Sequence, residues 1–244
     1  MDLEEHPSTG LLTVDLLQQN SLLSGLSGTD AAAAMQSGRL VHLRTRQPIY
    51  DANEQIRKVF FPINSVLSVV ARLEDGQMIE VGTIGREGVS GIPLLFGSTT
   101  SANESYCQVP GRAISLPAAF FTHLQEGNPG FRRLLDQYLQ AYINLLGQLA
   151  ACNRLHSVYE RCARWLLLTH DRVQVDVLPL THEFLAMMLG TRRSGVTIAA
   201  ATLKNAGFIE YAQGRITILD RAGLEGASCE CYAVARGQFG ELLH

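Results

Sequence analysis

The chain has 244 residues, of which 46% are hydrophobic and 18% are charged, and its formal net charge is −3 at pH 7. This length allows two modest domains, at ~100–200 residues each. No run approaches the ~18 consecutive apolar residues that a membrane span needs, so we expect no membrane partner. The acidic start at Met1–Glu5 lacks the basic segment of a secretory signal, which predicts a cytoplasmic protein.

The N-terminal half is predicted to form a β domain at residues 20–127, after a polar and flexible N-terminus at residues 1–19. Residues 20–35 have the pattern of a short helical start. Between about 41 and 116, short strand-like runs alternate with glycine-rich turns. Many short strands at near-regular spacing are typical of a sandwich or a barrel.

Two turn signals divide these strands into expected hairpins. An Asp-Gly pair at residues 75–76 separates strand-like runs at 66–73 and 78–84, which is a strong hairpin signal. A second pair of strand-like runs, within residues 105–116, flanks Pro110-Gly111. We predict that each pair of runs forms an antiparallel hairpin.

The pattern then becomes helical, and residues 128–157 are predicted to form a dimerisation helix. Asn128-Pro129 is a helix start, because proline suits the first helical turn. Along this helix, seven residues alternate in steps of four and three, the spacing that two helices need to wrap around each other. The alternative is that the same face packs on the β domain. The predicted seam consists of Leu135, Leu139, Tyr142, Leu146, Leu149, Asn153 and His156.

Residues 158–222 are predicted to form a winged helix-turn-helix. Thr181 precedes an apolar-periodic run and can accept backbone N–H bonds as an N-cap. Gly190 follows Ala186 by four residues, where the chain must turn sharply and a positive φ favours glycine. Thr191 is then placed to cap a second helix. The inward positions of the first helix are Leu185, Met188 and Leu189, and those of the second are Val196, Ala199, Ala200 and Leu203.

This arrangement lets the second helix enter a DNA major groove, which is ~12 Å wide. Arg193 is the candidate for reading guanine, whereas Arg192, Thr181 and Lys204 are expected to touch phosphate. A hairpin at 208–219 forms the predicted wing. The expected DNA-contacting residues are Thr181, Thr191, Arg192, Arg193, Ser194, Thr197, Lys204, Gln213 and Arg215. A winged helix that contacts protein instead of DNA is the alternative.

These motifs resemble those of the Crp/Fnr family of transcription regulators. Residues 180–196 are similar to the DNA-reading segment of that family, and residues 160–166 to the helix that leads into it. The resemblance covers about residues 20–221. It implies an α+β fold: a double-stranded β-helix or jelly-roll barrel of the cyclic-nucleotide-binding type, a long dimerisation helix and a C-terminal winged helix-turn-helix. It also implies a homodimer on a near-palindromic operator of double-stranded DNA, with RNA polymerase as a further partner.

The chain departs from the family pattern in its DNA-reading helix and in its barrel. Ser194 and Ile198 stand where glutamate and arginine are common, which predicts a different operator. In the barrel, the ribose-binding glutamate and the phosphate-binding arginine-serine pair are missing, and so are the hydroxyl residues of the long helix. A buried phosphate would then lack a charge partner. We therefore expect a degenerate effector pocket that does not bind cyclic AMP or cyclic GMP, marked by Ile92, Ala102, Asn103, Leu146 and Gly147.

No metal or cofactor is predicted. The five cysteines are scattered, which indicates reduced thiols, and residues 1–40 contain no cysteine to hold an iron–sulfur centre. Cys229 and Cys231, in a C-terminal extension at 223–244, have poor spacing for zinc. Sensing of haem, through His42, His123 or Cys107, of redox state or of a small apolar ligand stays open. An enzyme is disfavoured, because no nucleophile elbow and no phosphate-binding loop appears.

Overall fold

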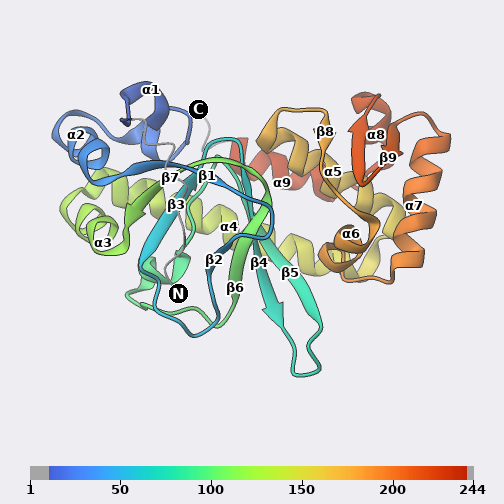
Figure 1. The fold of residues 1–244 in the computed structure, drawn as a ribbon, viewed down its shortest axis with the longest axis horizontal. Helices are drawn as coiled ribbons and strands as arrows, with labels where there is room; N and C mark the ends of the chain where they lie inside the picture. The colour runs from blue at the N-terminus through green and yellow to red at the C-terminus, as the bar shows by residue number, and fades with distance from the viewer. Residues whose placement is uncertain (1–10, 241–244) are drawn as a thin grey trace. The chain divides into compact units, whose positions relative to one another are not determined.

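Seven strands of the N-terminal half form two sheets (Figure 1) in a computed structural model that describes residues 11–240. The first sheet has three strands in the order β1-β7-β3, and the second has four in the order β2-β6-β4-β5. The strands are β1 (Arg39–Leu43), β2 (Pro48–Tyr50), β3 (Lys58–Pro62), β4 (Val66–Arg72), β5 (Met78–Ile84), β6 (Glu104–Val109) and β7 (Gly111–Pro117).

The hairpin predicted around Asp75-Gly76 is confirmed, because β4 and β5 are neighbours in the four-stranded sheet. Gly76 takes a φ of 82°, and its amide donates to the carbonyl of Leu73. The carboxylate of Asp75 accepts from the amide of Gln77 at 3.0 Å. The turn therefore needs a glycine for its positive φ and an aspartate to hold its backbone.

The second expected hairpin is wrong. β6 and β7 follow each other at Pro110-Gly111, but β6 belongs to the four-stranded sheet and β7 to the three-stranded one. Here the chain passes close to another segment, since a Cβ on Gly111 would lie 2.5 Å from the carbonyl oxygen of Asn64. The Pro-Gly pair thus marks a corner between sheets, which has the same local turn chemistry as a hairpin.

Short helices complete the N-terminal half: α1 (Val14–Leu17), α2 (Gly28–Ser37), α3 (Ala118–Gly127) and the 3₁₀ turns η1 (Leu23–Gly25) and η2 (Ile92–Phe96). Residues 1–10 of the expected flexible N-terminus lie outside the described residues. Residues 11–19 differ from that expectation, because they include α1, whose Leu17 is buried. Asn20 is also buried, and its amide donates to the carbonyls of Pro62 and Gly88.

The long helix α4 (Pro129–Leu155) begins at Pro129, as predicted. The side chains of Phe131, Leu135 and Tyr138 on its first half are buried. The boundary between two compact units of the chain falls within this helix: one unit consists of residues 11–69 and 83–142, and the other of residues 70–82 and 143–240.

The second of these, the C-terminal unit, is mainly helical. Its first helix after α4 is α5 (Val158–Val173), which starts with a capping box between Ser157 and Glu160. A small sheet has the strand order β8-β10-β9. The remaining elements are β8 (Val177–Leu178), α6 (His182–Met188), α7 (Arg193–Asn205), β9 (Ile209–Ala212), β10 (Arg215–Ile218), α8 (Arg221–Ala227) and α9 (Cys231–Gly240).

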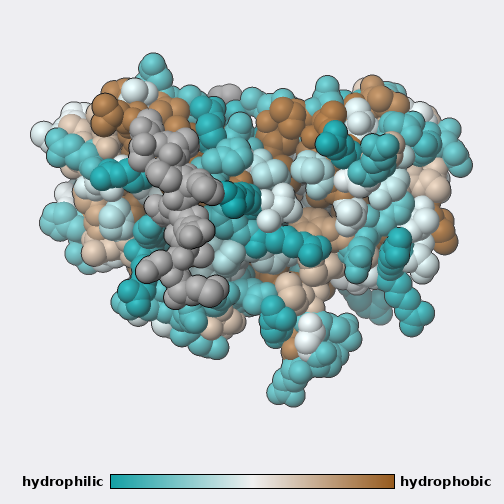
Figure 2. Space-filling model, in the orientation of Figure 1, coloured by the Kyte–Doolittle hydropathy of each residue, from teal (hydrophilic) through white to brown (hydrophobic). Residues whose placement is uncertain are grey.

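Hydrophilic residues cover most of the face shown in Figure 2, with hydrophobic side chains in scattered patches between them. Within residues 11–240, no helix combines the length and the apolar character that crossing a membrane requires.

Candidate nucleic-acid interface

The turn between α6 and α7 has the geometry that its sequence predicts. The hydroxyl of Thr181 accepts from the amide of Phe184 at 3.1 Å and caps α6. Gly190 takes a φ of 56°, and its amide donates to the carbonyl of Met187. The amide of Thr191 donates to the carbonyl of Ala186 at 3.0 Å. These bonds satisfy the end of α6 and turn the chain sharply into α7.

The buried face of α7 matches the predicted one, because Val196, Ala199, Ala200 and Leu203 are all buried. This face packs against α5 and α6. Alanine at two of the four positions lets helix backbones approach closely, as a helix-turn-helix requires.

The opposite face of α7 is exposed along its first three turns. Its exposed side chains include Arg193, Ser194, Thr197 and Ile198, and the side chain of Ile198 is 69% exposed. The prediction that Thr191 caps this helix is wrong. The N-cap residue is Arg192, and its side chain makes no hydrogen bond to the helix. The first amides of α7 thus lack the side-chain cap that Thr181 supplies to α6.

The wing is a tight hairpin of β9 and β10, in which Arg215 pairs with Ala212. The two turn residues, Gln213 and Gly214, have φ values of 51° and 72°. A two-residue turn with two positive φ values matches the right-handed twist of paired strands. As a result, the exposed side chains of Gln213 and Arg215 lie at the tip of the hairpin.

His182 joins the wing to both helices. Its ring stacks on Tyr211 of β9, with centroids 4.0 Å apart, and its Nδ1 lies 3.2 Å from the hydroxyl of Thr197 on α7. Burial, and then the charge of Arg193, lower the pKa of His182. Neither His182 nor Tyr211 was among the expected site residues, since the contact depends on how the hairpin folds back onto α6.

The basic residues of this region fall into two groups. Lys204 forms an ion pair with Glu210, and the hydrogen bond from Lys204 lowers the pKa of the Glu210 carboxyl. Arg221 pairs with acidic side chains at the end of α5 and on α8. In contrast, Arg192, Arg193 and Arg215 are exposed and form no ion pair with any residue that the structure describes. Positive charge is therefore available at the start of α7 and at the wing.

The positions expected to mark an effector pocket lie in two units. Ile92 is the first residue of η2, while Ala102 and Asn103 lie in the loop before β6. Leu146 and Gly147 are on the part of α4 that belongs to the C-terminal unit. Residues 91–103 contain no charged side chain.

The residues of the predicted dimer seam differ in exposure. Leu135 and Tyr142 are buried within this chain, whereas Leu139, Leu146 and Leu149 are half-buried and Asn153 is exposed. The exposed apolar side chain between them is Ile143, which is 51% exposed. The exposed face of α4 is thus rotated from the predicted seam.

The residues considered for haem do not converge. His42 on β1 and His123 on α3 are exposed, whereas Cys107 on β6 is buried. A different group comes together in the C-terminal unit: Cys152, His156, Cys229 and Cys231. From the sequence, His156 is expected in the dimer seam, and the thiols have no predicted role. The spacing of Cys152 and His156, one helical turn apart, was a signal for these two members of the group alone.

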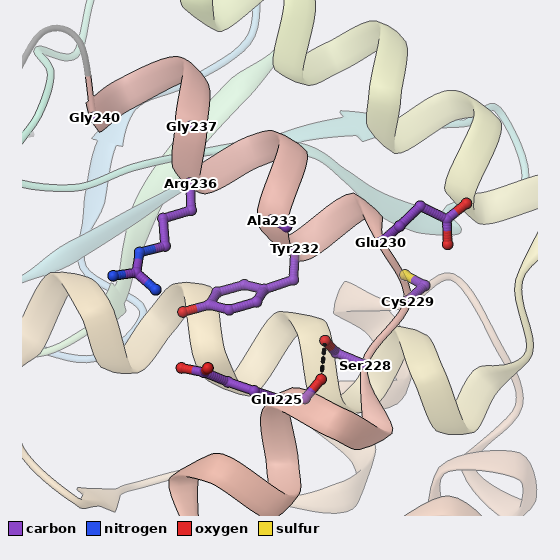
Figure 3. Close-up of a pocket in the computed structure, with 9 residues that line it drawn as sticks. All are labelled: Glu225, Ser228, Cys229, Glu230, Tyr232, Ala233, Arg236, Gly237 and Gly240. Carbon is purple, nitrogen blue, oxygen red and sulfur yellow. Dashed lines mark hydrogen bonds between the residues drawn. The ribbon is translucent and has the colours of Figure 1, made fainter.

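A pocket of about 540 Å³ lies beside this group, between α8 and α9 (Figure 3). Cys229 and Glu230 line it on one side, and Tyr232 and Arg236 project from α9 toward it.

Comparison with known proteins supports the helix-turn-helix. Residues 160–227 match the model of the Crp-like helix-turn-helix domain. A search of the curated proteins finds no match to the sequence.

Solved structures share the fold at low identity. One is a transcriptional regulator of the Crp/Fnr family from Eubacterium rectale (16% identity, 86% of this chain and 98% of that chain, TM-score 0.65). Another is FixK2 from Bradyrhizobium japonicum (15% identity, 79% and 98%, TM-score 0.65). A third is a transcriptional regulator of the CRP family from Thermus thermophilus (21% identity, 78% and 98%, TM-score 0.63).

The matched domain is a Crp-like helix-turn-helix, a type of domain that binds DNA, and the fold around it is shared with solved regulators of the Crp/Fnr type. The predicted fold class is confirmed: a β sandwich of the cyclic-nucleotide-binding type, a long helix and a winged helix-turn-helix. The DNA-binding domain belongs to the Crp-like helix-turn-helix family.

Proposed function

We propose that this chain is a transcription regulator that binds a near-palindromic operator as a homodimer. It reads the bases with the exposed face of α7. It acts in the cytoplasm, without control by cyclic AMP. The observation that carries this proposal is the exposed, unpaired Arg193 in the first turn of a helix whose opposite face is buried. A recognition helix enters the major groove with its N-terminal residues toward the bases. Arg193 then donates to O6 and N7 of a guanine.

Contacts with the DNA backbone are expected around this base contact. The first amides of α7, which no side chain caps, and the guanidinium of Arg192 suit a phosphate. Thr181 lies at the start of α6, and Arg215 and Gln213 lie at the wing tip. Lys204 is a weaker candidate, because a phosphate would compete with Glu210 for it.

Ile198 is expected to add an apolar contact to the recognition of the bases by α7. It lies one turn after Ser194 on the exposed face and is 69% exposed. A branched apolar side chain at a groove fits the C5-methyl group of thymine. The operator half-site should therefore contain a guanine read by Arg193 and a thymine read by Ile198, a few base pairs apart.

The dimer would form through the exposed face of α4. Leu139, Ile143, Leu146 and Ala150 follow one another in steps of four, three and four, which gives a continuous apolar stripe. Leu135 and Tyr142 are not part of this stripe because they are buried within the chain. Two-fold pairing would place two α7 helices about one DNA turn, ~34 Å, apart.

Independence from cyclic nucleotides is supported by the loop at residues 91–103. A cyclic nucleotide carries a phosphate charge, and this loop offers no charged side chain to balance it. Burying that charge without a partner costs several kcal/mol.

Selection of bound sequences from random DNA tests the proposal. We expect a near-palindromic motif from the full chain without added cyclic AMP, and binding that weakens steeply between about 50 and 200 mM salt. Recovery of no motif, together with binding that is insensitive to salt, would instead favour a winged helix that contacts protein. A motif that appears only with cyclic AMP would contradict the independence alone.

A further inference from the structure

Three thiols and an imidazole meet in the C-terminal unit, away from the DNA-reading face of α7. Cys152 lies in the last turn of α4 and His156 directly after it, whereas Cys229 lies in the link between α8 and α9 and Cys231 is the first residue of α9. One ligand atom from each of the four residues lies within 4.8 Å of all the others. The three cysteines are buried and His156 is half-buried.

The distances in this group fit the edges of a coordination tetrahedron. Cys152 Sγ and Cys229 Sγ are 3.5 Å apart, and Cys231 Sγ and His156 Nδ1 are 3.4 Å apart. Zinc bonds of ~2.3 Å to sulfur and ~2.0–2.1 Å to nitrogen imply edges of about 3.8 Å and about 3.5 Å in a tetrahedron. A metal ion at the centre would therefore need only small shifts of the side chains.

The fold produces this arrangement from two local pairs. Cys152 lies in the last turn of α4 and His156 directly follows the helix, where its amide donates to the carbonyl of Cys152 at 3.1 Å, so the two residues stay one helical turn apart. Cys229 and Cys231 stand on either side of Glu230 where α9 begins, and the backbone there turns as the amide of Tyr232 donates to the carbonyl of Cys229. One intervening residue is too few for a typical zinc pair on a single loop, but here the end of α4 and the residue that follows it supply the other two ligands.

Neighbouring side chains provide a hydrogen-bond acceptor for His156, and a hydrogen-bond donor and positive charge for the thiolates. The Nε2 atom of His156 lies 3.3 Å from the carboxylate of Glu230, which leaves Nδ1 to face the thiols. The amide of Gln148 donates to Cys231 Sγ at 3.0 Å. The buried guanidinium groups of Arg161 and Arg164 interact electrostatically with Cys152. Three thiolates and one Zn²⁺ carry a net negative charge, which these arginines balance.

We propose that Cys152, His156, Cys229 and Cys231 bind one Zn²⁺ ion in a closed tetrahedral site that ties the end of α4 to the start of α9. The ligands are three thiolates and an imidazole, a common set for a structural zinc. The pocket lined by Cys229 and Glu230 gives the ion a route from solvent (Figure 3). The zinc proposal does not depend on the proposed DNA binding.

The test measures metal in the full chain, purified under reducing conditions. We expect one zinc per chain by elemental analysis and by native mass spectrometry. Replacement by Co²⁺ should give the visible bands of a tetrahedral ion and a thiolate-to-cobalt charge-transfer band. Cys229→Ser and Cys152→Ser should lose most of the metal. The matched control is Cys162→Ser, which changes a buried cysteine of α5 outside the group and should keep one zinc per chain.

Several outcomes would overturn the proposal. One is that wild-type protein, folded and kept reduced, binds no added Zn²⁺. Another is that the protein has the absorption spectrum of an iron–sulfur cluster. A third is that Cys229→Ser leaves the metal content unchanged. A Cys152–Cys229 disulfide found by peptide mapping in protein kept reduced would also overturn it. The cobalt spectrum of the wild type decides the matter if a cysteine variant fails to fold.

Discussion

The imidazole of His182 stacks on the ring of Tyr211 at a centroid distance of 4.0 Å, while its Nδ1 faces the hydroxyl of Thr197. One side chain of α6 thus contacts the wing and the exposed face of α7. The contact fixes these two elements relative to each other, which matters because both would touch the same DNA segment.

The stack predicts a pH dependence of folding. The pKa of His182 is lowered in the folded chain by burial and by Arg193, whereas in the unfolded chain it should be ~6.5. Below that pH the unfolded state binds the extra proton more readily, so stability is lost as the pH falls below ~6.5. His182→Asn should show a weaker loss than the parent in urea unfolding between about pH 7.5 and pH 5.

Thr197→Val is the control for this experiment, since it removes the hydrogen bond but keeps the titrating ring. Its pH dependence should stay close to that of the parent. Parallel curves for the parent and His182→Asn would show that His182 is not the group responsible.

The role of Arg193 predicts a loss of specificity. Arg193→Ala should weaken operator binding by ~1–3 kcal/mol, which is about 5- to 150-fold, and should relax the preference at one base pair. Arg192→Ala should weaken binding to specific and random DNA about equally, because a phosphate contact carries no sequence information. Titrations of both variants against both kinds of DNA measure the difference. An equal loss on both kinds for Arg193→Ala would assign it to phosphate as well.

Two glycines of the helix-turn-helix predict opposite effects on stability. Gly190 has a φ of 56°, and a Cβ there would lie 2.5 Å from Ile79 Cδ1, so Gly190→Ala should destabilise the chain by about 1 kcal/mol or more. A Cβ on Gly195 would meet Thr191 Oγ1 at an ordinary 3.5 Å within a helix. Gly195→Ala should therefore stabilise the chain by ~0.5–1 kcal/mol.

Thermal unfolding and DNA titration show whether Gly195 serves the packing of the chain or the approach of α7 to DNA. If Gly195→Ala raises the melting temperature but weakens DNA binding, the glycine allows a close approach of the helix to DNA. If it lowers the melting temperature, the steric argument for this position is wrong.

The sequence predicted regular features better than those that depend on distant partners. The apolar period located the buried face of α7, and the glycine at 190 located the turn, because both are set by residues within one or two turns. The Pro110-Gly111 corner was mistaken for a hairpin, since turn chemistry does not say which sheet the next strand joins. The thiols of Cys152 and Cys229 are 77 residues apart in the chain, so no local pattern could pair them.

The exposed face of α4 predicts how the dimer can be broken. Ile143→Glu places a charge in the proposed apolar stripe and should shift the chain to a monomer, because burying an unpaired carboxylate is costly. Leu155→Glu is the matched control. Leu155 is also exposed, at 76%, but it lies about 120° around the same helix from Ile143, outside the stripe, and should leave the dimer intact.

Sedimentation at micromolar concentration measures both variants. A parent chain that is itself a monomer would rule out the proposed pairing. A monomeric Leu155→Glu variant with a dimeric Ile143→Glu variant would place the interface on the other side of α4.

Arg161 connects the proposed zinc site to the turn before α7. Its guanidinium donates to the carbonyl of Leu189, the C-cap of α6, and interacts electrostatically with Cys152 and Cys229. Arg161→Met should destabilise the chain by ~1–3 kcal/mol, because the buried carbonyl loses its donor. It should also weaken zinc binding, because one of the charges that balance the thiolates is removed.

A double-mutant cycle with Cys229→Ser separates these two effects. Without the zinc and its thiolates, Arg161 no longer balances their charge, so Arg161→Met should cost less in the Cys229→Ser background than in the parent. Urea unfolding of the four chains gives the coupling. If the losses in unfolding free energy of the two single variants add to that of the double variant within ~0.5 kcal/mol, Arg161 stabilises only the turn and the metal site is independent of it.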